Sequence, residues 1–319
     1  MLVDSPEYCV LICTRNRPAK LTVLLESLCV LTKQPNQVII VSSGQSIQSS
    51  LEEFKGRLEI LHKHIEGRGQ IRQKMEGVKL IDPINEWVAF LDDDLVLNFD
   101  AIENVFSTIS QHEASSRILG VGFSEESLVH KVNNLPRRLV SKIFGINTNS
   151  LGAVLPNGQN NSYMASKVVI QTSWLNGASF WRRDIAETYS FPFLEAKYSI
   201  CEDLIFSYKF SKNGILLFDP NSKYASQDGD AAADLNDETF RALTYWRLYF
   251  VLTNKELSVS AFLWAQIGRS LNYAIVGNLG IIKKCRRLLF GVRIFLDVCM
   301  LLVRNIPPVQ ILELKVTGN

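Results

Sequence analysis

Residues 87–94, with the sequence WVAFLDDD, join an apolar run to three consecutive aspartates. The run is too short for a helix and is typical of a buried strand. Asp92, Asp93 and Asp94 then stand at the carboxyl end of that strand, where Asp92 and Asp94 could both reach one hard cation, Mg²⁺ or Mn²⁺. Burying this much negative charge without a cation is costly. Taken alone, the segment fits a metal site and a solvated acidic turn or helix-start acid cluster equally well.

The segments before this stretch alternate between two patterns. Short apolar runs predict buried strands at residues 8–13, 37–42 and 57–61. Apolar residues spaced along one face predict helices between and after them, at residues 18–30, 70–81 and 99–111. Strands that alternate with helices indicate an α/β fold with a mostly parallel, Rossmann-like sheet that binds ligands at the carboxyl ends of its strands.

The second half of the chain extends this sheet and then changes character. We expect strands at residues 119–123, 172–178 and 215–218 and a helix at 201–212, which makes the sheet mixed. Residues 144–163 are rich in Gly, Asn and Ser and predict a long loop. From residue 236 onward the pattern is helical. With 319 residues, we expect a catalytic domain over 1–255 and a helical C-terminal segment over 256–319.

Composition excludes several classes of protein. A net charge of +2 is too small for binding nucleic acid over the whole surface. The six cysteines lack paired spacing, so a disulfide framework and a structural zinc site are disfavoured and a reducing cytosol is the expected location. Residues 1–7 contain acids and no apolar core, and nothing there predicts export.

Polar side chains also follow two other predicted strands and begin one helix. Such groups beside a helix N-terminus suit a phosphorylated ligand. Together with the acidic stretch they predict a site for a nucleoside diphosphate, although each arginine alone is more often a surface charge. The candidates are Thr14, Arg15, Asn16, Arg17, Ser42, Ser43, Arg68 and Arg72.

The order of these motifs resembles the family-2 glycosyltransferases, in which a Thr-x-Asn-Arg strand end, a small polar strand end, an Arg-containing helix start and Leu-Asp-Asp-Asp follow one another. Residues 174–184 (WLNGASFWRRD) are similar to the Gly-rich acceptor-side segment of that family. Residues 201–204 (CEDL) are similar to its Glu-Asp motif. The resemblance covers residues 8–255, and the ordered set is far more specific than any one motif.

The resemblance implies a GT-A fold and an inverting, metal-dependent transfer from a nucleotide-sugar donor. Asp203 would be the general base and Glu202 would orient the acceptor. Asp94 would bind Mn²⁺ or Mg²⁺, with Asp92 at the donor ribose or metal shell and Asp93 on the donor side. The acceptor side would comprise Trp174, Asn176, Gly177 and Ala178. Taken alone, the Glu202–Asp203 pair also fits an exposed acid pair in the first turn of a helix.

The sequence departs from the family pattern at two places. Ser42 and Ser43 stand where many members hold the nucleotide base with an Asp, which leaves the base unidentified. Many members also supply a His ligand after the Glu-Asp helix, whereas here Gln227, Asp228 or water would complete the metal shell. The four histidines, His62, His64, His112 and His130, lie elsewhere and are interpreted as ordinary core or surface residues.

The C-terminal segment contains two apolar stretches, residues 257–282 and 288–303, that are interrupted by charges. Neither is a convincing membrane span. Residues 283–287 (KKCRR) between them could meet anionic headgroups, so interfacial amphipathic helices are expected, peripheral on the inner face of the cytoplasmic membrane. The alternative is that these helices pack on the catalytic domain. An apolar tail favours a lipid-linked sugar or glycan acceptor in surface glycan or polysaccharide biosynthesis.

Three other functions are weighed against glycosyl transfer. A nucleotidyltransferase would have a Gly-rich phosphate loop after the first strand, and residues 13–17 (CTRNR) contain no glycine. A dehydrogenase would have a GxGxxG motif at the same place. A nucleotide-sugar or glycan-binding module that has lost catalysis remains the main alternative, and Asp92, Asp94 and Asp203 argue against it.

Overall fold

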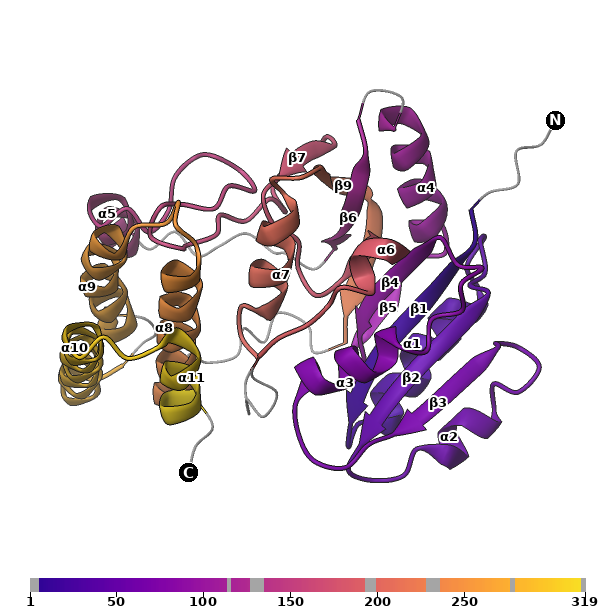
Figure 1. Cartoon of the computed structure of the whole chain (residues 1–319), viewed down its shortest axis with the longest axis horizontal. Coiled ribbons are helices and arrows are strands. Elements are labelled where there is room, and N and C mark those ends of the chain that lie inside the picture. Colours follow the sequence, from indigo (N-terminus) through magenta and orange to yellow (C-terminus); the bar gives the residue numbers. More distant parts are fainter. Residues whose placement is uncertain are drawn as a thin grey trace. The chain divides into compact units, whose positions relative to one another are not determined.

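The structure is a computed structural model that describes residues 6–113, 116–126, 135–192, 199–227, 236–275 and 279–316. The chain forms two compact units (Figure 1). The sheet unit comprises Met1–Val129, Tyr163–Glu195 and Glu202–Ala231, and the helical unit comprises the rest of the chain.

The sheet unit is built on nine strands within the described residues, in the order β3-β2-β1-β4-β8-β6-β9-β5, with β7 also paired to β9. The strands are β1 (Tyr8–Arg15), β2 (Gln37–Ser43), β3 (Ile60–His64), β4 (Trp87–Asp92), β5 (Leu95–Leu97), β6 (Ile118–Glu125), β7 (Ile170–Thr172), β8 (Ser179–Arg182) and β9 (Ile215–Ser226).

Strand direction divides the sheet into two parts. The strands β3, β2, β1 and β4 are all parallel. The strand β8 is antiparallel to both β4 and β6, whereas β6 and β9 are parallel. The predicted α/β fold with a mixed sheet is therefore confirmed. Because Cys13 pairs with Asp92 and Thr14 with Ser42, the carboxyl ends of β1, β2 and β4 meet at one edge.

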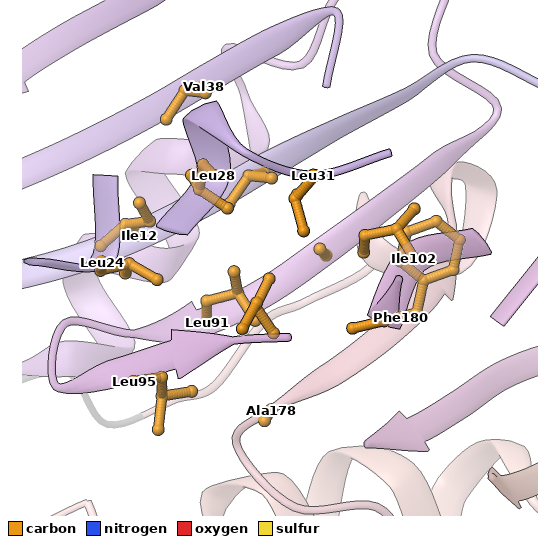
Figure 2. Packing of buried hydrophobic residues seen from close by; sticks show 14 of the residues in the cluster. Ile12, Leu24, Leu28, Leu31, Val38, Leu91, Leu95, Ile102, Ala178 and Phe180 are labelled. Carbon is orange, nitrogen blue, oxygen red and sulfur yellow. The ribbon is translucent and has the colours of Figure 1, made fainter. Parts of the chain in front are cut away.

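Alternating side chains of the strands bury two faces of the sheet against helices. One face packs on α1 (Pro18–Cys29), α2 (Gln48–Glu52) and α4 (Ala101–His112) through a continuous apolar cluster. Figure 2 shows Leu24 and Leu28 of α1 beside Ile12 and Leu91 of the sheet. The other face carries α3 (Gln70–Val78), α6 (Arg183–Ala186) and α7 (Glu202–Phe210).

The third strand lies further along the chain than predicted. The strand β3 begins at Ile60, three residues after the predicted start, and continues to His64. Backbone N–H groups of Arg57 and Leu58 donate to Phe54 O, so these residues still belong to the turns after α2. An edge strand that is only half buried can hold His62 and Lys63, and a search for apolar runs misses such residues.

The strand predicted at residues 172–178 is wrong. Residues 173–178 form a loop between β7 and β8. The backbone N–H of Leu175 donates to Ser207 Oγ and that of Asn176 donates to Tyr163 Oη, at 3.0 and 2.8 Å. Apolar side chains are buried here because the loop crosses the core. The hydrogen bonds of its backbone N–H groups go to side chains and not to a neighbouring strand.

The helical unit contains α5 (Leu135–Ile143), α8 (Asp237–Thr253), α9 (Val259–Ile275), α10 (Ile281–Val303) and α11 (Pro308–Val316). The described residues after 235 form no strand, as predicted. Residues 144–163 form the predicted loop, with one isolated bridge between Val154 and Asn160. Among the helices in the described ranges, none has the length and apolarity needed to cross a bilayer.

Candidate active site

The turn between β4 and β5 is tied to the end of β1. Thr14 Oγ1 donates to Asp93 Oδ2 at 2.7 Å, and Arg17 Nη1 donates to Asp93 Oδ1 at 3.1 Å. Arg17 Nη1 also reaches Asp94 Oδ2 at 3.3 Å, and Lys20 Nζ lies 3.9 Å from the same oxygen. Asp93 is buried, so it anchors the turn, whereas Asp94 remains partly exposed at the sheet edge.

Asp92 ends β4 and faces the loop that carries Gly177. Its Oδ1 accepts a hydrogen bond from Gln70 Nε2 at 2.7 Å. A Cβ built on Gly177 would lie 2.6 Å from Asp92 Oδ2 and 3.4 Å from Asp203 Oδ2, so both carboxylates approach the backbone of this glycine closely. Burial first, and then the charges of Asp203, Asp94 and Asp93, raise the pKa of Asp92 to about 6 against the opposing effect of Lys74.

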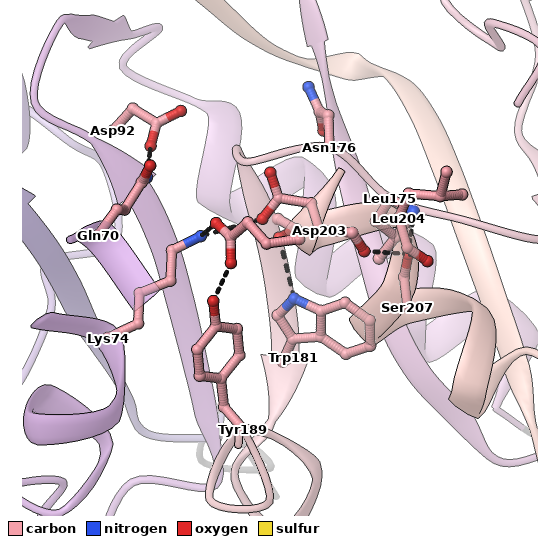
Figure 3. A network of polar contacts seen from close by, with 12 residues as sticks. Gln70, Lys74, Asp92, Leu175, Asn176, Trp181, Tyr189, Asp203, Leu204 and Ser207 are labelled. Carbon is pink, nitrogen blue, oxygen red and sulfur yellow. Dashed lines mark hydrogen bonds and ion pairs between the residues drawn. The ribbon is translucent and has the colours of Figure 1, made fainter. Parts of the chain in front are cut away.

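A buried lysine joins the two acids at the start of α7 (Figure 3). Lys74 Nζ donates to Glu202 Oε1 at 2.7 Å and to Asp203 Oδ1 at 3.0 Å. Tyr189 Oη donates to Glu202 Oε2. Lys74 and Glu202 are almost fully buried, whereas the Asp203 side chain is 32% exposed. Glu202 is therefore fully occupied by its partners, and Asp203 is the acid that an incoming ligand can reach.

The charges of this group depend on one another. Burial alone lowers the pKa of Lys74, but the carboxylates of Asp203, Glu202 and Asp92 raise it well above its usual value. Burial, followed by the charge of Asp203, raises the pKa of Glu202 well above that of an ordinary carboxyl. Lys74 thus stays an ammonium ion and is the positive centre around which the acids are arranged.

The predicted acceptor-side residues divide into two groups. Asn176 is held in the site, since its Oδ1 accepts from Tyr163 Oη at 3.0 Å and its Nδ2 donates to Tyr224 Oη at 3.1 Å. Trp174 packs its ring 4.8 Å from that of Tyr163. Ala178, in contrast, lies in the core cluster.

Ser42 has two histidine partners. Ser42 Oγ lies 2.8 Å from His62 Nε2 and 3.0 Å from His64 Nδ1, both on the neighbouring strand β3. Burial, followed by the charge of His64, lowers the pKa of His62. These two histidines therefore surround a predicted donor residue, which their interpretation as ordinary residues did not anticipate. Ser43 is buried, and among the described residues its Oγ has no hydrogen-bond partner.

The remaining predicted donor residues are less closely tied to the carboxylates. Asn16 Oδ1 accepts from the Gln45 backbone N–H at 2.8 Å, so its amide supports the neighbouring loop. Arg15 and Arg68 are exposed and Arg72 is partly exposed. Across the described part of the chain, none of these three arginines forms an ion pair with Asp92, Asp93 or Asp94.

The oxygen donors at the sheet edge fit a hard divalent cation. Asp94 is partly exposed, and Asp92 directs one oxygen toward Gly177. No group of three His, Cys, Asp or Glu side chains able to hold a metal occurs in the described ranges. Mg²⁺ typically uses one or two carboxylates plus phosphate oxygens and water, so two aspartates suffice. Gln227 donates its backbone N–H to Asp94 O, and its Nε2 to Lys20 O. Asp228 lies outside the described residues.

Three site residues were missed from the sequence: Gln70, Lys74 and Tyr189. Lys74 had a usable signal, because it lies on the apolar face of α3 at helical spacing from Ile71 and Val78. A lysine on a buried face requires an anionic partner. Gln70 and Tyr189 carry no such signal, since each meets its acidic partner only in the folded chain.

Residues 9–159 match the model of the family described as Glycosyl transferase family 2. The resemblance inferred from the motifs is thus confirmed over these residues. No curated protein matches the sequence.

Solved structures share the fold. S. aureus TarS 1-349 in complex with UDP-GlcNAc has a TM-score of 0.56 at 15% identity, with 91% of this chain and 80% of that chain covered. The mannosyltransferase PcManGT from Pyrobaculum calidifontis, in complex with GDP-Man and Mn²⁺, has a TM-score of 0.55 at 12% identity, with 92% and 81% covered.

Proposed function

We propose that this glycosyltransferase, whose residues 9–159 belong to glycosyl transferase family 2, moves a sugar from a nucleoside-diphosphate sugar to an acceptor hydroxyl with inversion at the anomeric carbon. One observation carries the proposal. The reachable acid Asp203 and Asp92, at the end of β4, each direct a carboxylate oxygen at Gly177. An acceptor bound at Asp203 and a donor bound at Asp92 would therefore meet beside Gly177.

In the proposed reaction Asp203 takes the proton of the acceptor hydroxyl. The hydroxyl oxygen forms a bond to the anomeric carbon as the bond between that carbon and the diphosphate oxygen breaks. Lys74 holds Asp203 Oδ1 at 3.0 Å, which leaves Oδ2 directed toward Gly177. Glu202, bound by Lys74 and Tyr189, acts through the position of Lys74.

On the donor side we assign the metal to Asp94 with support from Asp92. A bound Mn²⁺ or Mg²⁺ would neutralise negative charge on the leaving diphosphate. Arg17 and Lys20 stand beside Asp94 and can share the phosphate charge. We place these residues in a catalytic domain over residues 1–255.

Nucleotide binding should depend on both the metal and Asp94. With Mn²⁺, one nucleoside diphosphate is expected to raise the Tm of the protein by several degrees, since a ligand at 100 times its Kd adds about 2.7 kcal/mol. The shift should vanish with chelator and with Asp94→Ala. Thermal unfolding of the purified chain measures both, and the responding nucleotide names the base.

Glu59→Ala is the matched control, because it removes an exposed carboxylate of the sheet unit and should leave the shift intact. If no nucleotide stabilises the chain under any metal condition, the donor-site assignment fails. Stabilisation without turnover of any nucleotide sugar would favour the binding-module alternative.

We further propose that α10 brings the enzyme to an anionic membrane, where a lipid-linked sugar or growing surface glycan is the acceptor. One face of α10 packs in the helical unit through Gly291, Ile294, Val298 and Leu301. Another face is exposed and apolar at heptad-like spacing, through Ile282, Cys285, Leu289, Val292, Leu296 and Val303.

The charged residues of α10 favour an anionic partner for this exposed face. The helix contains five basic residues, Lys283, Lys284, Arg286, Arg287 and Arg293, and a single acid, Asp297. Asp297 already binds Tyr245 and Lys315. Cations that flank an exposed apolar stripe suit anionic headgroups, at about 1 kcal/mol for each Lys or Arg near the surface.

The protein is therefore expected to float with vesicles that contain an anionic lipid and to stay behind with zwitterionic vesicles. Leu296→Glu should reduce the bound fraction at least tenfold. Leu314→Glu, which alters an equally exposed leucine on α11, should bind like the wild type. Failure to float, together with dimerisation that Leu296→Glu abolishes, would assign the stripe to a second copy of the chain.

A further inference from the structure

The helical unit buries two arginines that the proposed reaction does not use. Arg247 lies on α8 and Arg269 on α9, with 6% and 9% of their surfaces exposed. Both meet the same turn of the loop that precedes Tyr163. Arg247 Nε donates to Gly158 O at 3.3 Å, and Arg269 Nη2 donates to Asn157 O at 3.4 Å. The two guanidinium groups therefore hold adjacent carbonyls.

These contacts compensate the two charges only weakly. The distances lie beyond the usual 2.7–3.2 Å range for N–H···O hydrogen bonds. A third bond, from Arg269 Nη1 to Gln266 Oε1, is 3.2 Å long. Arg269 Nε is buried, and no hydrogen-bond partner reaches it within the described part of the chain. Each of these acceptors is neutral, and the Phe262 ring, whose centroid lies 5.3 Å from Arg269 Cζ, adds a cation–π contact without a formal negative charge.

Among the described residues, neither guanidinium forms an ion pair with a carboxylate. Burial first, and then the charge of Arg247, lower the pKa of Arg269 well below its usual value. Two like charges buried near one another are strongly unfavourable unless an anion joins them. The two guanidinium groups thus offer N–H donors to an anion, and an anion would supply the negative charge that their present contacts lack.

The surroundings hold these donors in position. Gln266 Nε2 donates to Thr244 Oγ1 at 3.2 Å, which turns the amide oxygen toward Arg269. Gly158 has a φ of +73°, and a Cβ there would lie 2.7 Å from Val251 Cγ2 and 3.3 Å from Arg247 Cγ. The turn can approach α8 this closely only because residue 158 has no side chain.

We propose that Arg247 and Arg269 bind a phosphoryl group in the helical unit. Guanidinium groups present paired N–H donors that match phosphate oxygens, and two of them suit a tetrahedral anion better than a single carboxylate. The phosphoryl group can come from free phosphate or a phosphomonoester, or from a phosphodiester within a larger substrate. Both sources share the same chemistry at the two arginines.

The test measures the Tm of the full chain against inorganic phosphate, with chelator present and ionic strength held constant with NaCl. Phosphate should raise the Tm of the wild type, and Arg269→Met and Arg247→Met should each weaken its apparent affinity at least tenfold. Arg304→Met removes an exposed arginine of the same unit and should respond like the wild type. Arg17→Met removes the donor-side arginine and should also keep the response.

A wild type whose Tm does not respond to phosphate overturns the proposal. So does a response that Arg17→Met abolishes and Arg269→Met keeps, because the anion then belongs to the sheet unit. If the methionine variants do not fold, Arg269→Lys keeps the charge, loses the paired donors, and should still weaken phosphate binding. Dimethyl phosphate distinguishes the two sources of the phosphoryl group. If it competes with inorganic phosphate, the site accepts a phosphodiester. If it does not compete, the site is specific for free phosphate or a phosphomonoester.

Discussion

Asp203→Asn is expected to slow sugar transfer by about 10²- to 10⁴-fold, the usual contribution of a positioned general base. The substitution keeps the shape of the side chain and removes its ability to accept the acceptor proton. Donor binding should change little, because Asp203 is proposed to act on the acceptor and not to bind the donor or its metal. Steady-state rates and nucleotide-induced Tm shifts, measured on the same preparation, separate the two effects.

The control for this variant is Glu103→Gln, which alters an exposed acid in the first turn of α4. An acid that serves only the helix dipole contributes roughly 0.3–1 kcal/mol to stability and nothing to catalysis. If Asp203→Asn transfers sugar within tenfold of the wild type, Asp203 is such an acid, and the proposed base must be abandoned.

Lys74→Met is expected to lower the free energy of unfolding by about 3–5 kcal/mol, the usual cost of removing one partner of a buried ion pair. Glu202 would remain buried without its ammonium partner, and Asp203 would lose the contact that positions it. Urea denaturation followed by tryptophan fluorescence measures the loss. Adding Glu202→Gln should recover part of it, because the orphaned charge is then removed.

Lys63→Met provides the comparison, since Lys63 Nζ pairs with Glu76 at 2.8 Å in a much more exposed setting. Exposed pairs contribute about 0–1 kcal/mol. The pH dependence adds a second check. Burial raises the pKa of Glu202, and a carboxyl with a raised folded-state pKa loses stability as pH rises through that pKa. Lys74→Met should therefore be less destabilising at pH 5 than at pH 8, and an equal loss would contradict this account.

Much of the fold can be predicted because β1, β2 and β4 are short runs whose residues are almost all buried. Such runs stand out from helical patterns by length alone. The edge strand β3 breaks the rule, since its outer side chains are polar and its start depends on where the turns after α2 end. The strand prediction over residues 173–178 fails for the opposite reason. The apolar residues of this loop are buried although its backbone does not pair with a neighbouring strand.

The candidate site is predictable where residues adjacent in sequence also act together, as in the acidic turn and the Glu202–Asp203 pair. Lys74 joins elements 128 residues apart, and only the folded chain shows which acids it serves. The partnership of Ser42 with His62 and His64 depends on the register between β2 and β3. The individual catalytic roles stay predictions until the variants above are measured.

Gly177 limits how the enzyme can evolve. Even an alanine would bring a methyl group to within 2.6 Å of Asp92 Oδ2, and Gln70 holds that carboxylate in place. A randomised library at codon 177, selected for activity, is expected to return mainly glycine. Changes of acceptor preference must then accumulate around a fixed glycine.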